Sequence, residues 1–132
     1  STVWRSIRQR YLWVYNMSRQ EENVVLCGAN SYEQKYYLNQ QFQSLPQTIK
    51  EELQIMCVLY TEEVGGILTM EFEPDGTLIF RSIADDMDYY YDDISAGLKI
   101  KQMQQTKMEL LESLEMYYKV FFLKEVPNMK MD

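Results

Sequence analysis

The densest group of side chains that could do chemistry lies between Asp85 and Asp93, where five aspartates and three tyrosines occur within nine residues. Carboxylate oxygens suit calcium or magnesium, but the stretch lacks the alternating spacing, central glycine and terminal glutamate of an EF-hand loop. Carboxylates beside exposed tyrosines also suit a basic partner. A third interpretation is that the aspartates favour the positive end of a helix. The candidates for the cation or partner site are Asp85, Asp86, Asp88, Tyr89, Asp92 and Asp93.

Other catalytic or cofactor motifs are missing from the sequence. The chain has no histidine, which removes the commonest general base and the commonest transition-metal ligand. Cys27 and Cys57 are 30 residues apart with no Cys-x-x-Cys pattern, so we expect two reduced, buried thiols. The alternative for Cys27 is a reactive thiol, because it stands where a strand meets Gly28. No phosphate-binding glycine pattern occurs. We therefore expect no catalytic, cofactor or metal residue, and the sequence favours a non-enzymatic protein.

The net charge of the chain limits the classes of molecule that it is expected to bind. The formal charge is −7 and the isoelectric point is near 4.6, which argues against binding nucleic acid through its phosphates. Self-association or a basic protein partner is favoured instead. No uninterrupted apolar run approaches the roughly 18 residues of a membrane span. Arginines and apolar residues interleave in residues 1–15, so we expect no signal peptide there. We expect a cytoplasmic protein.

The charge also divides the chain near residue 17. Residues 1–16 hold three arginines, no acid and both tryptophans, so the rest of the chain carries −10. One hypothesis is that residues 1–16 are an extension of a single domain at 17–126, followed by a tail at 127–132. The competing interpretation is a genuine first helix, because apolar residues recur at helical spacing. These residues are Val3, Ile7, Tyr11 and Val14.

The middle of the chain predicts strands around one helix. Residues 24–27 form a short apolar run typical of a buried strand, and residues 32–38 are a weaker second strand. A helix is expected from Leu45-Pro46, with Ser44 as its N-cap, to Gly65-Gly66. Two alternating runs, 67–73 and 77–83, flank Pro74-Asp75-Gly76 and predict a β-hairpin.

The last part of the sequence predicts a long helix from about Asp86 to Leu123, ended by Pro127. Its apolar stripe turns by roughly 160°, so either the helix breaks between about Leu98 and Met103 or its halves pack on different surfaces. The distal stripe is our candidate for a contact with a second subunit. It comprises Leu110, Leu114, Tyr117, Tyr118 and Phe121. The fold class is α+β: a small antiparallel sheet with a central hairpin, one amphipathic helix before it and a long, perhaps broken helix after it.

Several segments resemble a family of short conserved hypothetical proteins from anaerobic Gram-positive bacteria. They are Val25-Leu26-Cys27-Gly28-Ala29-Asn30-Ser31-Tyr32, Lys35-Tyr36-Tyr37-Leu38-Asn39, Glu63-Val64-Gly65-Gly66-Ile67-Leu68 and Gly97-Leu98-Lys99-Ile100-Lys101. The resemblance covers about residues 24–123 and implies no catalytic residue. The helix, hairpin and helix at 45–105 are also similar to the central unit of roadblock and longin-type domains, which are dimerising scaffold and regulatory modules. No three-stranded run follows the last helix here, so only strands before residue 40 could complete the sheet.

These observations favour a homodimeric interaction or regulatory module. The alternatives are a small-molecule or divalent-cation binding protein that uses the acidic stretch at 85–93, and an acidic decoy for a basic partner.

Overall fold

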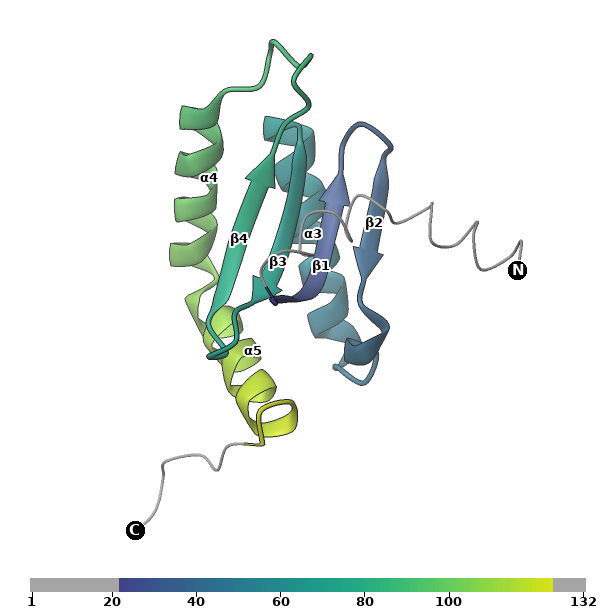
Figure 1. Ribbon diagram of the computed structural model, residues 1–132, viewed down its shortest axis with the longest axis vertical. Coiled ribbons are helices and arrows are strands. Elements are labelled where there is room, and N and C mark those ends of the chain that lie inside the picture. The colour runs from purple at the N-terminus through teal and green to yellow at the C-terminus, as the bar shows by residue number, and fades with distance from the viewer. Residues whose placement is uncertain (1–21, 125–132) are drawn as a thin grey trace, which may run out of the picture.

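Two β-hairpins form one four-stranded antiparallel sheet with the strand order β2-β1-β3-β4 (Figure 1). This computed structural model describes residues 22–124, so the predicted extension at 1–16 and the tail at 127–132 lie outside the described residues. The strands are β1 (Val24–Asn30), β2 (Lys35–Leu38), β3 (Ile67–Phe72) and β4 (Leu78–Ile83). The helices are the short 3-10 helix η1 (Gln40–Phe42), α3 (Gln47–Val64), α4 (Asp93–Thr106) and α5 (Met108–Phe121).

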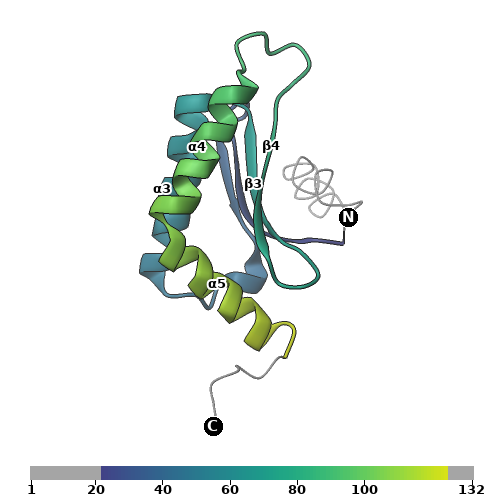
Figure 2. The same cartoon turned by 90° about the vertical axis from the view of Figure 1, so that its left-hand side faces the viewer.

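Helices α3 and α4 lie on the same side of the sheet, and α5 runs from that side across the end of the sheet at the β3–β4 turn (Figure 2). Helix α3 connects the two hairpins and packs on β1 and β3. Helix α4 lies against α3, where Lys99 Nζ contacts Glu63 Oε1 at 3.0 Å, and just after α4 Lys107 Nζ contacts Glu52 Oε2 of α3 at 2.8 Å. The predicted α+β class is therefore confirmed, and the strands before residue 40 do complete the sheet. No helix within 22–124 is long and apolar enough to cross a membrane.

The core lies between the sheet and the helices. Alternate residues of β3 enter it, namely Leu68, Met70 and Phe72, as the apolar alternation predicts. At one end, four aromatic rings stack between η1, β3 and α5. Their centroids are 5.6 Å apart for Phe42 and Phe72, 4.2 Å for Phe72 and Tyr118, and 4.9 Å for Tyr118 and Phe122. This stack fixes α5 to the sheet.

The C-terminal helix differs from the prediction at both its start and its break. Residues 85–92 form a loop, and the break falls at Lys107 instead of between Leu98 and Met103. The aspartates explain the late start. Asp85 Oδ1 accepts the Met87 N–H at 2.8 Å, and Asp88 Oδ1 accepts the Tyr90 N–H at 3.1 Å. Such local bonds compete with helical ones.

Helix α3 ends where the sequence predicts, but the predicted N-cap at its start is wrong. Ser44 is not the N-cap; its hydroxyl bonds the Tyr117 hydroxyl at 2.9 Å, while Pro46 precedes the helix without a side-chain cap. The C-terminal end is as predicted, with Gly65 and Gly66 at φ of 87° and 72°. A Cβ at Gly66 would stand 2.7 Å from the Ile83 carbonyl oxygen, so close packing as well as backbone conformation requires glycine.

Candidate interaction face

The sheet has a second face, which points away from the helices. On β3, Thr69 and Glu71 alternate with the core residues and so point to this side. The strand register places Val25 of β1 and Ile79 of β4 beside Glu71. We define the second face by the residues that this register brings together: Val25, Tyr37, Thr69, Glu71, Ile79 and Arg81.

A bulge in β1 decides which residues reach this face. The register with β3 shifts between Val25 and Cys27, and both Leu26 and Cys27 are fully buried in the core. Strict alternation would have sent one of these two side chains to the second face. The bulge instead leaves Val25 opposite Glu71 on the second face.

Glu71 is the centre of a polar network on the second face. Its Oε2 accepts hydrogen bonds from the Thr69 hydroxyl at 2.8 Å and from Arg81 Nε at 3.2 Å. Its Oε1 accepts one from Asn23 Nδ2 at 3.1 Å. Thus β3, β4 and the residue before β1 all supply donors to one carboxylate. A buried charge requires such paired and hydrogen-bonded surroundings.

The second face is buried at its centre, although α3 and α4 lie on the other side of the sheet. Thr69 and Glu71 are 0% exposed and Val25 is 6% exposed. Figure 2 shows α3 and α4 on the opposite side of the sheet and α5 crossing below its end. A glutamate is almost never fully buried unless it is paired, and a bare sheet face would leave its central residues in contact with water. Val25, Thr69 and Glu71 at the centre of this face are therefore as buried as residues of a covered surface, whereas Tyr37, Ile79 and Arg81 around them are partly exposed.

The acidic stretch does not gather into one site. Asp92 caps α4, accepting the Ile94 N–H at 3.0 Å and the Ser95 hydroxyl at 2.8 Å, and these bonds lower its pKa. Asp85 and Asp88 close local turns, and Asp88 also accepts the Tyr32 hydroxyl at 2.7 Å. Asp86, Tyr89 and Asp93 are exposed. Across residues 22–124 no three carboxylate, thiol or imidazole side chains come together as a metal site would need.

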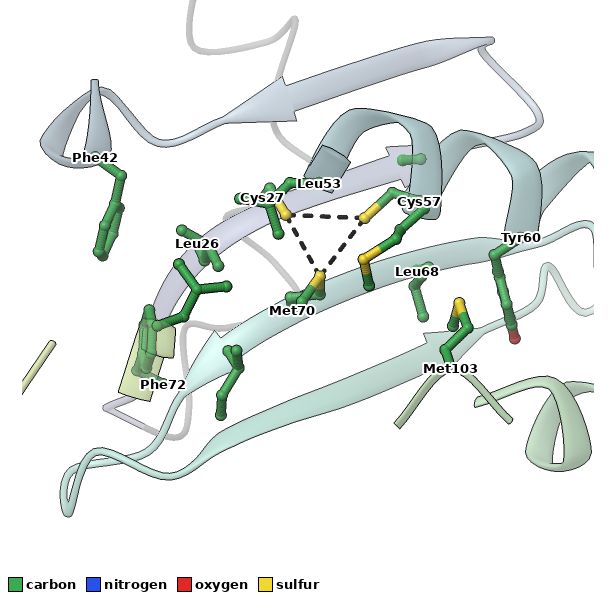
Figure 3. Close-up of a cluster of buried hydrophobic side chains, with 14 of the residues drawn as sticks. Leu26, Cys27, Phe42, Leu53, Cys57, Tyr60, Leu68, Met70, Phe72 and Met103 are labelled. Carbon is green, nitrogen blue, oxygen red and sulfur yellow. Dashed lines mark hydrogen bonds between the residues drawn. The ribbon is translucent and has the colours of Figure 1, made fainter. Parts of the chain in front are cut away.

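Three sulfur atoms meet in the core instead (Figure 3). Cys27 Sγ and Cys57 Sγ are 3.8 Å apart, and they lie 3.6 and 3.7 Å from Met70 Sδ. Both thiols are free and buried, as expected from the sequence. The contact with Cys27, together with complete burial, raises the pKa of Cys57. Since the thiolate is the nucleophile and metal ligand, this environment suppresses both kinds of chemistry.

A cleft of about 550 Å³ lies beside this core, between the first hairpin and α3. Tyr36 lines it, and the Tyr36 hydroxyl is buried without a hydrogen-bond partner in the described part of the chain. Burial first, and then the nearby thiols of Cys27 and Cys57, raise the pKa of Tyr36. The hydroxyl therefore stays protonated.

The residues of the predicted interface stripe on α5 differ in burial. Leu114 and Tyr118 are 2% and 5% exposed and belong to the core of the same chain. Leu110 and Tyr117 pack partly against that core, whereas Phe121 is 62% exposed. Leu114 and Tyr118 are thus not free to contact a second subunit, and a contact through α5 stays a prediction for the exposed edge of the helix.

The fold and the second face define an α+β domain whose antiparallel sheet is covered by helices on one side and carries a buried charged network on the other. The chain belongs to a family of unknown function, DUF6145, whose model matches residues 23–126. The resemblance to an uncharacterised family is thereby confirmed for that part of the chain. No curated protein and no solved structure matches the sequence.

Proposed function

We propose that this domain is a non-enzymatic, cytoplasmic protein-interaction module that binds an amphipathic, arginine-bearing helix on the second face of its sheet. The observation that carries the proposal is the complete burial of Thr69 and Glu71 on the face opposite α3 and α4. Burying a carboxylate is costly, and the cost is offset only while its surroundings stay dry and hydrogen-bonded. Such a face requires a cover.

The chemistry of the second face defines the kind of cover. Val25 and Ile79 flank Glu71 and offer apolar surface, which suits the apolar stripe of a helix. The chain outside residues 1–16 carries −10, which favours arginines along the edges of that helix. A helix laid by its apolar stripe on an apolar surface is an established mode of recognition.

A second copy of this chain is the partner we propose, because residues 1–16 carry the required chemistry. Val3, Ile7, Tyr11 and Val14 recur at helical spacing, and the three arginines have no acid among them. Exchange of this segment between two copies would give the homodimer that the sequence led us to expect. The similarity of residues 45–105 to roadblock and longin-type modules, which dimerise, agrees with this proposal as an analogy of fold.

A peptide of residues 1–16 tests the proposal in trans. The receptor is the full chain with Ile7→Asp, whose own stripe is interrupted so that it no longer competes for the face. We expect the peptide to bind, as measured by calorimetry, and the same peptide carrying Ile7→Asp to bind at least tenfold more weakly.

Two receptor variants locate the binding surface. Adding Val25→Asp to the receptor places a charge on the second face and is expected to abolish binding. Adding Ile55→Asp, at a 57% exposed position of α3 on the helix side, is the matched control and should leave binding unchanged. If binding of the peptide is lost at high salt but is unchanged by Val25→Asp, the result would favour the acidic decoy and contradict a docking site on the second face.

A further inference from the structure

We infer that the outer edge of β2, together with the cleft beside α3, binds an extended, basic peptide segment of a partner protein as a fifth strand of the sheet. The segment pairs its backbone with β2 and inserts an apolar side chain into the cleft. This site is separate from the second face, so the inference goes beyond the proposed function and does not depend on it.

The hydrogen bonding of β2 gives the first argument. Within residues 22–124 its only neighbouring strand is β1, because β2 stands at the end of the strand order. The Asn39 N–H donates to the Leu26 carbonyl oxygen at 3.0 Å, so backbone groups that face β1 recur at every second residue before Asn39. The N–H and C=O groups of Tyr36 and Leu38 therefore point to the outer edge, where an added strand can pair with them.

A comparison of the two sheet edges favours β2 and a short partner segment. At the β4 edge, the Leu78 N–H donates to Glu115 Oε2 of α5 at 2.8 Å, so a helix already occupies one end of that edge. Strand β2 is four residues long and contains Lys35. A short edge with a lysine disfavours pairing with the edge of another sheet. A short peptide segment therefore suits this edge better than a second copy of the chain.

The cleft gives the second argument. It has a volume of about 550 Å³, and Tyr36 of the first hairpin and Val58 of α3 are among the residues that line it. Tyr36 and Leu38 lie opposite the core residues Ala29 and Cys27, so their side chains are on the helix side of the sheet. A strand added outside β2 follows the same alternation. Every second side chain of the segment thus points to the side of the sheet on which α3 and the cleft lie.

The charge of the cleft indicates the class of peptide. Glu62 of α3 lines the cleft and is exposed, and no lysine or arginine within residues 22–124 forms an ion pair with it. Lys35, which also lines the cleft, lies 3.3 Å from Glu33. The net charge of −7 adds to the preference for a cation. A lysine or arginine two residues from the apolar residue would point to the same side of the segment and reach Glu62.

Random heptapeptides displayed on phage are the probe, selected against the full chain. We expect enrichment of an apolar residue with lysine or arginine two positions away. The selected peptides are then synthesised, and calorimetry measures their binding. N-methylation of one set of alternate residues removes the N–H groups that face β2 and should weaken binding at least tenfold. N-methylation of the other set keeps the side chains and those N–H groups, and should change binding by less than threefold.

Val58→Arg and Leu59→Arg are a matched pair of receptor variants on α3. Arginine at Val58 should fill the cleft and weaken binding at least tenfold. Leu59 is 52% exposed and about 100° around the helix from Val58, outside the cleft lining, so arginine there should leave binding unchanged. Thermal unfolding checks that each variant folds. Gln54→Arg, at an exposed position in the cleft lining, replaces Val58→Arg if that variant does not fold.

Three results would overturn the inference: no peptide is selected, both N-methylated sets bind equally well, or the cleft variant leaves binding unchanged. A peptide whose binding is lost with Val25→Asp but kept in the cleft variant would occupy the second face instead. None of these results alters the binding expected for the peptide of residues 1–16. The inference and the proposed function can therefore fail separately.

Discussion

Glu71 and Arg81 face one another across β3 and β4, with Arg81 Nε 3.2 Å from Glu71 Oε2. The carboxylate is fully buried, whereas the arginine side chain keeps 26% of its surface exposed. Loss of the ion pair should therefore cost more stability when Arg81 is removed than when Glu71 is removed. Removing the arginine would leave a buried charge, while removing the charge would leave an arginine that still reaches water.

The first prediction concerns this asymmetry. Arg81→Met should lower the free energy of unfolding by about 3–5 kcal/mol, because it removes the cation that pairs with the buried Glu71 carboxylate within residues 22–124. Glu71→Gln should cost less, since the amide oxygen can still accept from Thr69. The double variant should be more stable than Arg81→Met alone. Urea unfolding of the four proteins measures the coupling, and strictly additive losses would contradict a paired network.

The second prediction compares two glycines. Gly66→Ala should be strongly destabilising, because a Cβ would meet the Ile83 carbonyl oxygen and the Tyr91 ring at 2.7 Å in a backbone with φ of 72°. Gly97 lies within α4, and a Cβ there meets nothing within 4 Å. Gly97→Ala should therefore stabilise the protein by up to about 1 kcal/mol. Thermal unfolding of both variants should show shifts of opposite sign, and a loss of stability with Gly97→Ala would argue against this helix.

The third prediction follows from the buried thiol. The pKa of Cys57 is raised in the folded state, so above the unfolded value of about 8.5 the unfolded chain loses a proton that the folded chain keeps. The stability contributed by the neutral thiol is complete below that pH. It falls as the pH rises, by up to about 1.4 kcal/mol per pH unit for one thiol.

Urea unfolding under reducing conditions at pH 7.5 and 9.5 tests this pH dependence. The wild-type chain should lose stability between the two values, and Cys57→Ala should lose less over the same interval. Equal losses in the two proteins would exclude Cys57 as the source. Tyr36 and Tyr60, whose pKa values are also raised by burial, should add to the loss only above about pH 10.

The fourth prediction separates packing from association on α5. Tyr118 stacks on Phe72 with ring centroids 4.2 Å apart, so Tyr118→Ala should cost about 3–5 kcal/mol. Phe121 is exposed on the same helix, and Phe121→Ala should change stability by less than about 0.5 kcal/mol. Sedimentation of Phe121→Ala then tests the contact expected from α5. If the proposed dimer shifts toward the mass of a monomer, the contact is supported, and an unchanged mass would leave the second face as the proposed surface for association.

Local patterns were sufficient to predict much of this fold. Gly65-Gly66 predicted where α3 ends, and Pro74-Asp75-Gly76 predicted the turn between the two strands of the second hairpin, because left-handed and tight-turn conformations depend on residues next to one another. The alternation of β3 likewise predicted that Leu68, Met70 and Phe72 form core. The helix start predicted near Asp86 was wrong, since the same aspartate side chains that favour a helix start also form turns that exclude a helix.

The sequence by itself determined a chain without histidine in which residues 1–16 are basic and hold both tryptophans, while residues 17–132 are acidic. It marked Thr69 and Glu71 only as polar residues of an alternating strand. The tertiary structure decided that Glu71 is buried, bonded to Arg81 and Asn23, and placed opposite the helices. The physical reason is that burial and charge pairing depend on strand register and on the bulge in β1, which bring together residues up to 58 positions apart, as for Asn23 and Arg81.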